Sequence, residues 1–276
     1  MMKFEVDAGK CIKCGLCATD CPFGIITPPD GENPPGVVAE RAAYCIKCGH
    51  CQAVCPTGAS SLGYDGVSLS KYTTDKLFVD PRQLANHMRL RRSVRKYKEE
   101  PVSKELLEEL LDTARYAPSG TNRQPVGWII TYGHYKVHKL AEAVINWMAS
   151  EMNKDSYYAK VLPIAAFVRA WEKGIDTIFH HAPHVITAYA HKDNHIAGVD
   201  CAIALTWLDL LMPSHGIGVC WAGLFELAMM HDPEMRKMLG VPEDHVTKGT
   251  LIFGYPKFKY NQIPGRNLAK IIWNED

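Results

Sequence analysis

The chain has 276 residues, enough for one large domain or two smaller ones. Hydrophobic residues make up 47% and charged residues 22%, and the net charge is +1, so the composition does not favour nucleic acid as a partner. The most apolar run, residues 196–213, contains Asp200 and Asp209, which argues against a membrane span. The start, MMKFEVDAGK, lacks the apolar core of a secretory signal. We therefore expect a cytoplasmic protein.

The ten cysteines do not suit a disulfide scaffold, because eight of them lie within the first 55 residues. Residues 11–22 (CIKCGLCATDCP) recur 34 residues later as residues 45–56 (CIKCGHCQAVCP). Both copies obey C-x2-C-x2-C-x3-C-P, the spacing that holds two [4Fe–4S] clusters, with the fourth cysteine of each copy reaching the other cluster. The spacing therefore predicts two ligand sets: Cys11, Cys14, Cys17 and Cys55, and Cys45, Cys48, Cys51 and Cys21.

Two structural zinc sites are the alternative, because four-cysteine zinc sites also use C-x2-C spacing. Such sites separate two CxxC pairs, whereas consecutive steps followed by C-x3-C-P, found twice, favour iron–sulfur clusters. Residues 3–63 resemble the bacterial-type ferredoxins with two clusters, and residues 27–36 form a turn-rich insertion between the halves. A module with so few bulky apolar residues is expected to depend on its clusters for folding.

Residues 64–85 are expected to link this module, residues 1–63, to a second domain over residues 86–276. A turn is expected at Tyr64-Asp65-Gly66, and a helix at Pro81, after Asp80 as its N-cap. Residues 82–98 then carry seven Lys or Arg and no Asp or Glu. This run is either a solvated helix end or, less suitably for a neutral protein, a nucleic-acid contact. We favour a third reading, in which several of these cations converge on one phosphate.

The second domain is expected to mix helices and strands. Ser103 caps a helix whose apolar side chains follow a 3.6-residue period, with Val102 and Leu107 placed to form a hydrophobic staple. Residues 116–125 read as a loop, and residues 153–181 as a polar and aromatic stretch. Strands are expected at 128–132, 184–190, 218–221 and 250–255, and further helices at 137–152, 196–212 and 233–239.

Four motifs in the second domain occur in the order found in the nitroreductase family of FMN enzymes. They are RRSVR at 91–95, APSGTNRQP at 117–125, GVCWAG at 218–223, and GYP at 254–256 followed by IPGR at 263–266. The whole chain thus resembles a ferredoxin–nitroreductase fusion. The resemblance implies an α+β fold, a homodimer with FMN at its interface, and alternating reduction and reoxidation of the flavin by two substrates.

The resemblance also implies which residues bind FMN. The phosphate would be held by Arg91, Arg92, Ser93, Arg95 and Arg266, which supply cations and a hydroxyl. The polar edge of the ring would meet Asn122 and Gln124, beside the turn Pro118-Ser119-Gly120, and Ala222-Gly223 would bring a backbone amide near flavin N5. Gln262 departs from the family, where several members have a second Arg. No side chain is predicted to be catalytic, because the flavin would carry the chemistry.

Three further features are given structural interpretations. Gly216-Ile217-Gly218 follows a helix and precedes a strand, the reverse of a dinucleotide-binding loop. A metal site at His180, His181 and His184 is weighed against a surface cluster at a helix end, and the surface cluster is favoured. Cys201 and Cys220 are expected to be small buried residues and not redox-active thiols.

Two functions from different classes follow. In the first, the protein is an oxidoreductase that passes electrons from a low-potential donor, such as reduced ferredoxin, through two [4Fe–4S] clusters to FMN. The acceptor would be a small nitroaromatic, quinone or activated alkene. In the second, the protein is an electron carrier or redox sensor whose flavin domain docks a partner. The intact flavin motifs favour the first, and the identity of the donor, whether ferredoxin or a nicotinamide, stays open.

Overall fold

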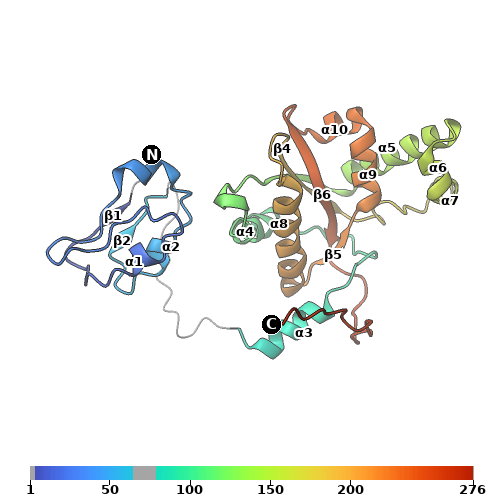
Figure 1. Cartoon of the computed structure of the whole chain (residues 1–276). Coiled ribbons are helices and arrows are strands. Elements are labelled where there is room, and N and C mark those ends of the chain that lie inside the picture. The colour runs from blue at the N-terminus through green and yellow to red at the C-terminus, as the bar shows by residue number, and fades with distance from the viewer. Residues whose placement is uncertain (1–3, 65–78, 276) are drawn as a thin grey trace. The chain divides into compact units, whose positions relative to one another are not determined.

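The computed structural model describes residues 4–64 and 79–275, which divide by their contacts into two units (Figure 1). The first unit contains Met1–Phe78 together with Ser119–Arg123, and the second contains Val79–Pro118 and Gln124–Asp276. The turn expected at Tyr64-Asp65-Gly66 and most of the expected linker lie outside the described residues.

The N-terminal module is built from two copies of one short structural unit. Helices α1 (Leu16–Thr19) and α2 (His50–Ala53) each begin directly after a glycine with positive φ, at 75° for Gly15 and 80° for Gly49. The lysine two residues earlier in each copy is also left-handed, with φ of 55° and 50°. The repeated sequence therefore folds into a repeated backbone, in which glycine occupies a position that other residues adopt at a cost.

A small apolar core and a two-stranded sheet hold the copies together. Strands β1 (Glu5–Val6) and β2 (Ser60–Ser61) pair antiparallel, and the buried side chains between the copies are Cys17, Ile26, Cys51 and Leu62. A 3₁₀ helix, η1, covers Ala39–Tyr44. The insertion between the copies is a closed loop, because the Gly36 amide donates to the Thr27 hydroxyl at 2.9 Å. With so little apolar material, this module has a core of which cysteines are a main part.

The second unit is built around a four-stranded antiparallel sheet. Its strands β3 (Gly127–Tyr132), β4 (His184–His191), β5 (Gly218–Trp221) and β6 (His245–Gly254) lie in the order β3-β4-β6-β5. All four predicted strands are confirmed. Two details differ: β6 begins earlier than predicted, and β3, whose apolar sequence predicts a buried strand, is a half-buried edge strand.

Helices cover both faces of the sheet, because alternate residues of its strands are apolar on opposite sides. Leu251 and Phe253 of β6 pack with α4 (Lys104–Ala114) and α8 (Ala197–Leu211), which lie on one face. The intervening Ile252 packs on the other face. The helices of that second face are α5 (His134–Asn153), α7 (Ile164–Glu172), α9 (Gly223–His231) and α10 (Pro233–Leu239).

Several helix starts form as the sequence predicts. The Asp80 carboxylate accepts from the amides of Arg82 and Gln83 at the start of α3 (Pro81–Leu90). The Ser103 hydroxyl accepts from the Leu106 amide at the start of α4, where the expected staple residues are buried. These caps satisfy amides that have no partner inside the helix.

Other parts of the prediction were incomplete or wrong. Helices α6 (Tyr157–Val161), α7 and α9 were not predicted, and short 3₁₀ helices η3 (Gly120–Asn122) and η4 (Met212–His215) also occur. The prediction of a surface histidine cluster at a helix end is wrong, because His184 is fully buried at the start of β4. The predicted order of helix and then strand around residues 216–218 is confirmed, since a 3₁₀ helix ends at His215 and β5 begins at Gly218.

One segment among the described residues, Ala197–His215, has the length and composition of a membrane span. It consists of α8 and η4, and α8 packs against the sheet on one face. Both Asp200 and Asp209 within it are buried in the protein, as expected for the core helix of a globular domain.

Candidate functional site

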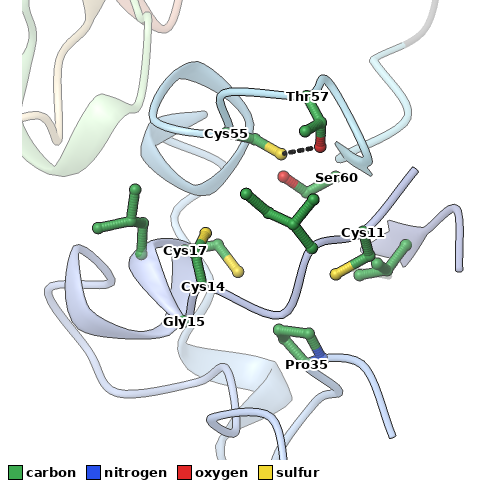
Figure 2. Close-up of a pocket in the computed structure, with 11 residues that line it drawn as sticks. Cys11, Cys14, Gly15, Cys17, Pro35, Cys55, Thr57 and Ser60 are labelled. Atoms are coloured by element: carbon green, nitrogen blue, oxygen red, sulfur yellow. Dashed lines mark hydrogen bonds between the residues drawn. The ribbon is translucent and has the colours of Figure 1, made fainter.

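The first group of candidate side chains lies around a cavity in the N-terminal module. Cys11, Cys14, Cys17 and Cys55 line this cavity, which Figure 2 shows with Thr57 and Ser60 on one side of it. Three of the cysteines come from the first copy of the repeat and Cys55 from the second. The two copies thus supply one cavity jointly.

A second cavity of the module has the reciprocal lining. Cys45, Cys48 and Cys51 of the second copy surround it together with Cys21 of the first. These are the two sets into which the sequence spacing divides the cysteines. The remaining lining of this cavity is mostly apolar and aromatic and consists of Pro22, Phe23, Ile25, Ile26, Ile46, His50 and Leu62.

The cysteines of each set encircle a space instead of converging on one point. No group of three His, Cys, Asp or Glu side chains within residues 4–64 and 79–275 is placed to hold a single metal ion. All ten cysteines are free of disulfides. Four thiols around a cavity suit a cluster, whose iron atoms each take one cysteine, better than they suit one tetrahedral zinc.

Hydrogen bonds to the fourth cysteine of each copy come from equivalent backbone amides. The Ala59 amide donates to the Cys55 sulfur at 3.2 Å, and the Ile25 amide donates to the Cys21 sulfur at 3.4 Å. Burial alone would raise the pKa of the Cys55 thiol, but hydrogen bonds from Ser60 and Thr57 outweigh it and lower the pKa to about 6. Burial raises the pKa of Cys51 to about 11. The environment of Cys55 therefore favours a thiolate.

The second group of candidate side chains gathers around β5 in the second unit. Ser93 and Val94 run beside this strand: the Val94 amide donates to the Val219 carbonyl at 2.9 Å. The approach is close, since a Cβ at Gly218 would lie 2.7 Å from the Val94 side chain. Arg91, Ser93 and Arg95 all interact electrostatically or by hydrogen bonding with the buried Cys220 of β5. The strand thus brings together three of the residues predicted to bind phosphate.

A buried carboxylate that the sequence analysis did not assign lies in this group. The Asp209 Oδ2 atom is 3.4 Å from the Arg91 guanidinium and accepts a hydrogen bond from Trp221 Nε1 at 3.2 Å. Its other oxygen, Oδ1, is buried and has no partner among the described residues. An acidic residue in an otherwise apolar helix was the signal in the sequence, because such a residue needs a partner when it is buried.

The predicted residues Ala222 and Gly223 lie where β5 leads into α9. The Ala222 amide is used within the sheet, donating to the Thr250 carbonyl at 2.9 Å. No side chain caps α9, which begins at Gly223. A Cβ at Gly223 would meet nothing within 4 Å. The start of α9 therefore presents backbone amides and open space, an arrangement that suits a group with partial negative charge.

The predicted loop residues are divided between the two units. Pro118 and Gln124 belong to the second unit, and Ser119, Gly120 and Asn122 group with the first. The Asn122 amide group donates to the carbonyls of Ile46 at 3.1 Å and Lys47 at 2.9 Å. Within this loop Thr121, Asn122 and Gln124 all have φ near 50°. Such left-handed backbone costs free energy in residues other than glycine and is concentrated at functional sites.

The last two predicted phosphate residues are not part of the group around β5. Arg92 folds back on the backbone, donating to the carbonyls of Arg91 at 2.7 Å and Arg89 at 2.6 Å. Arg266 lies in residues 257–275, an exposed C-terminal segment. The same segment contains Gln262, the residue at which this sequence differs from several members of the family. The two cysteines outside the repeat, Cys201 and Cys220, are both buried, as predicted.

Comparison with known proteins assigns both parts of the chain. Residues 88–255 match the model of the nitroreductase family, and residues 10–59 match that of a 4Fe-4S dicluster domain. The first match covers more than half of the chain. The protein is therefore a member of the nitroreductase family, with a 4Fe-4S dicluster domain at its N-terminus. The predicted α+β fold and family are confirmed.

Individual relatives agree with this assignment. A protein of Archaeoglobus fulgidus with the provisional name NADH dehydrogenase/NAD(P)H nitroreductase is 28% identical over 60% of this chain and 82% of its own length. The crystal structure of a nitroreductase with bound FMN from Bacteroides fragilis matches with a TM-score of 0.54 and 25% identity, covering 68% of this chain and 98% of that one. An FMN-bound nitroreductase from Desulfitobacterium hafniense matches in fold, with a TM-score of 0.56, 24% identity and coverage of 70% and 98%.

Proposed function

We propose that the protein is an FMN-dependent oxidoreductase whose two [4Fe–4S] clusters pass electrons from a low-potential donor to the flavin. The flavin then reduces a small organic acceptor of the nitroaromatic, quinone or activated-alkene class. One observation carries the proposal: a chain of the nitroreductase family also contains two cavities that are each lined by four cysteines. A reductase fed only by a nicotinamide has no need of such cavities.

The proposed cluster ligands are the two sets of cysteines around these cavities. The chemistry of the donor set supports the assignment, because four thiolates per site are what a [4Fe–4S] cluster requires. The two glycines with positive φ bring backbone amides close to the site without a side chain in the way. Each cluster would transfer one electron at a time.

The group around β5 is the proposed FMN site. Arg91, Ser93 and Arg95 would hold the phosphate, with Arg92 beside them, and the start of α9 at Ala222-Gly223 would lie against the flavin ring. The open space at Gly223 and the uncapped amides of α9 support this placement. Bound there, the flavin would supply the transfer of hydride or single electrons, and the protein would position it.

The loop and the C-terminal segment would complete the FMN site. Pro118, Ser119, Gly120, Asn122 and Gln124 would meet the polar edge of the ring, which the strained backbone of this loop supports. Arg266 can reach a phosphate only if the exposed segment 257–275 packs against a domain. Since no described part of its own chain covers that segment, we propose that a second copy does so in a homodimer.

Exposed apolar side chains support the homodimer. Leu268, Ile272 and Trp273 of the C-terminal segment are 94%, 88% and 77% exposed, and α8 exposes Val199 and Trp207. Large apolar side chains that gather on a protein surface often mark an interaction site. We further propose that reduced ferredoxin or a similar low-potential protein donates the electrons, and that the protein acts in the cytoplasm.

Cofactor analysis after anaerobic purification tests the proposal. We expect about eight iron atoms, eight inorganic sulfides and one FMN per chain. Stoichiometric zinc with little iron would contradict the cluster assignment. Iron and sulfide without flavin, after addition of excess FMN, would contradict the assignment of the second unit as an FMN enzyme.

A further inference from the structure

The two cysteine cavities differ in one respect that the repeat makes easy to see. The two copies place equivalent backbone amides on Cys21 and Cys55, at 3.4 and 3.2 Å. The side chains that follow these cysteines are not equivalent. Where the second copy has Thr57, the first has Phe23. The amides of Ile25 and Ala59 are therefore equivalent, and the side chains beside the two cysteines are where the sequence of the two sites differs.

The Thr57 hydroxyl is directed at a cysteine sulfur. Its Oγ1 atom lies 3.7 Å from the Cys55 sulfur, as the dashed line in Figure 2 shows. A cysteine that binds iron is a thiolate and carries no proton, so in the cluster-bound protein the hydroxyl must be the donor. Phe23 of the other copy lines the second cavity with an aromatic ring and has no proton to donate.

Ser60 adds a second hydroxyl to the same side of the first cavity, where the first copy has Ile26. Its hydroxyl donates to the Cys51 carbonyl at 2.7 Å, so its one proton is only shared with the Cys55 sulfur. We therefore expect Thr57 to have the larger effect on Cys55.

We propose that the hydroxyl of Thr57 raises the reduction potential of the cluster at Cys11, Cys14, Cys17 and Cys55 above that of the cluster at Cys21, Cys45, Cys48 and Cys51. The inference rests on the proposed function, because it requires both clusters. A hydrogen bond to a ligand sulfur stabilises the reduced cluster, which carries one more negative charge, more than the oxidised cluster. The first electron from a donor therefore resides at the Cys55 site, and the other site is reduced second.

Two other differences between the cavities bear on this order. Cys14 is exposed, whereas the equivalent Cys48 is half-buried, and greater exposure to water also favours the reduced form of the first cluster. His50 stands where the first copy has Leu16, and a positive charge there would favour the second cluster instead. His50 is exposed, so water and salt screen its charge, and we expect the hydroxyl and the exposure to prevail.

A redox titration of the full-length, anaerobically purified protein tests the proposal, with dithionite as the electron donor and EPR as the detector. We expect two one-electron transitions. Thr57→Val keeps the shape of the side chain and removes the hydroxyl. It should lower the midpoint potential of the upper transition. At a fixed potential the ratio of reduced to oxidised cluster should fall on the order of tenfold, which corresponds to about 59 mV for one electron. Ser61→Ala, a hydroxyl removed from the neighbouring position in β2, should change neither transition.

The reciprocal variant, Phe23→Thr, tests the same claim at the other site. It places a hydroxyl at the equivalent position beside Cys21 and should raise the lower transition while leaving the upper one in place. The proposal would be overturned if Thr57→Val left both midpoint potentials unchanged. It would also be overturned if Thr57→Val shifted only the lower one. If Thr57→Val fails to assemble its cluster, Phe23→Thr decides alone. An unchanged midpoint potential of the lower transition in that variant would overturn the proposal. Purified protein with zinc in place of iron would instead overturn the proposed function.

Discussion

Arg91, one of the proposed phosphate residues, forms an ion pair with Asp209, with 3.4 Å between the guanidinium and the carboxylate. The carboxylate is 6% exposed and the guanidinium 30% exposed, so the pair lies at the edge of the core. Trp221 donates a hydrogen bond to the same carboxylate oxygen. Arg91 therefore has a structural partner as well as a proposed ligand, and the two roles can be separated by mutation.

Arg91→Ala should weaken FMN binding and also destabilise the second domain. Loss of a charge-assisted contact to phosphate costs about 1.5–3 kcal/mol of binding free energy. Because Asp209 is then left buried without its cation, the free energy of unfolding should fall by about 1–3 kcal/mol, less than for a fully buried pair. Urea unfolding followed by tryptophan fluorescence checks this, because all six tryptophans follow residue 88.

The double variant Arg91→Ala/Asp209→Asn distinguishes the two roles. It removes the unpaired charge while the asparagine oxygen can still accept from Trp221. Stability should recover most of its loss, and FMN affinity should remain as low as in Arg91→Ala. Recovery of FMN affinity in the double variant would show that Arg91 does not contact the phosphate.

Gly223→Ala should weaken FMN binding without destabilising the flavin-free protein. A Cβ at this position meets nothing within 4 Å in the flavin-free chain, and a helical alanine is favoured over glycine by about 0.5–1 kcal/mol. The flavin-free variant should therefore be as stable as the wild type or more so. The same methyl would occupy space that we assign to the flavin, so FMN titration should show weaker binding. Unchanged FMN affinity would show that the flavin ring does not lie against the start of α9.

Buried His184 should make the second domain less stable in acid. Burial, and then the nearby His134, lower the pKa of His184 from about 6.5 to about 4. Its Nε2 atom accepts a hydrogen bond from the Val102 amide at 3.0 Å, and protonation would break this bond. Between these two pKa values the unfolded chain binds more protons than the folded one. Stability is thus fully present above pH 6.5 and is lost as the pH falls towards 4, by about 3 kcal/mol.

Urea unfolding at a series of pH values, again followed by tryptophan fluorescence, measures this loss. His184→Gln retains an acceptor for Val102 and cannot titrate in this range, so it should flatten the pH dependence below 6.5. His195→Gln, at an exposed position, should leave the dependence as in the wild type. A steep acid dependence that survives in His184→Gln would assign the effect to other groups.

Cys201 and Cys220 should resist alkylation in the folded protein. Burial raises the pKa of Cys201 to about 12 and also raises that of Cys220. Neither thiol is therefore a thiolate at neutral pH, and neither is open to solvent. Peptide mapping after treatment with iodoacetamide should find both unmodified until urea is added. Rapid labelling of Cys220 in the folded protein would instead point to a reactive thiol beside the proposed flavin site.

Local signals in the sequence predicted much of the fold. Caps such as Asp80 and Ser103 mark helix starts with side chains whose hydrogen bonds are local, so their effect does not depend on the rest of the molecule. The alternation of apolar residues predicted the strands for a similar reason. The cysteine spacing predicted two sets of four, because the geometry of a cluster is encoded over a few residues.

Features that depend on tertiary contacts were not accessible in this way. Helix α9 is apolar on most sides and has no cap, so it shows neither a periodic pattern nor a start signal. Helix α6 does have a cap, Ser156, so its start was predictable from the sequence. The burial of His184 and the pairing of Arg91 with Asp209 join residues far apart in sequence, and only the folded chain shows that these groups meet.

The central claim, that electrons reach the flavin through the clusters, is tested most directly by stopped-flow measurement of flavin bleaching with a reduced ferredoxin as donor. Cys48→Ala removes a proposed ligand of the second cluster and leaves the proposed FMN site untouched. Cys201→Ala, a cysteine outside both cavities, is the matched control. Reduction of the flavin by dithionite should remain in both variants. With reduced ferredoxin, bleaching should fall steeply in Cys48→Ala and proceed as in the wild type in Cys201→Ala. Equal rates in Cys48→Ala and the wild type would mean that electrons enter at the flavin and bypass the clusters.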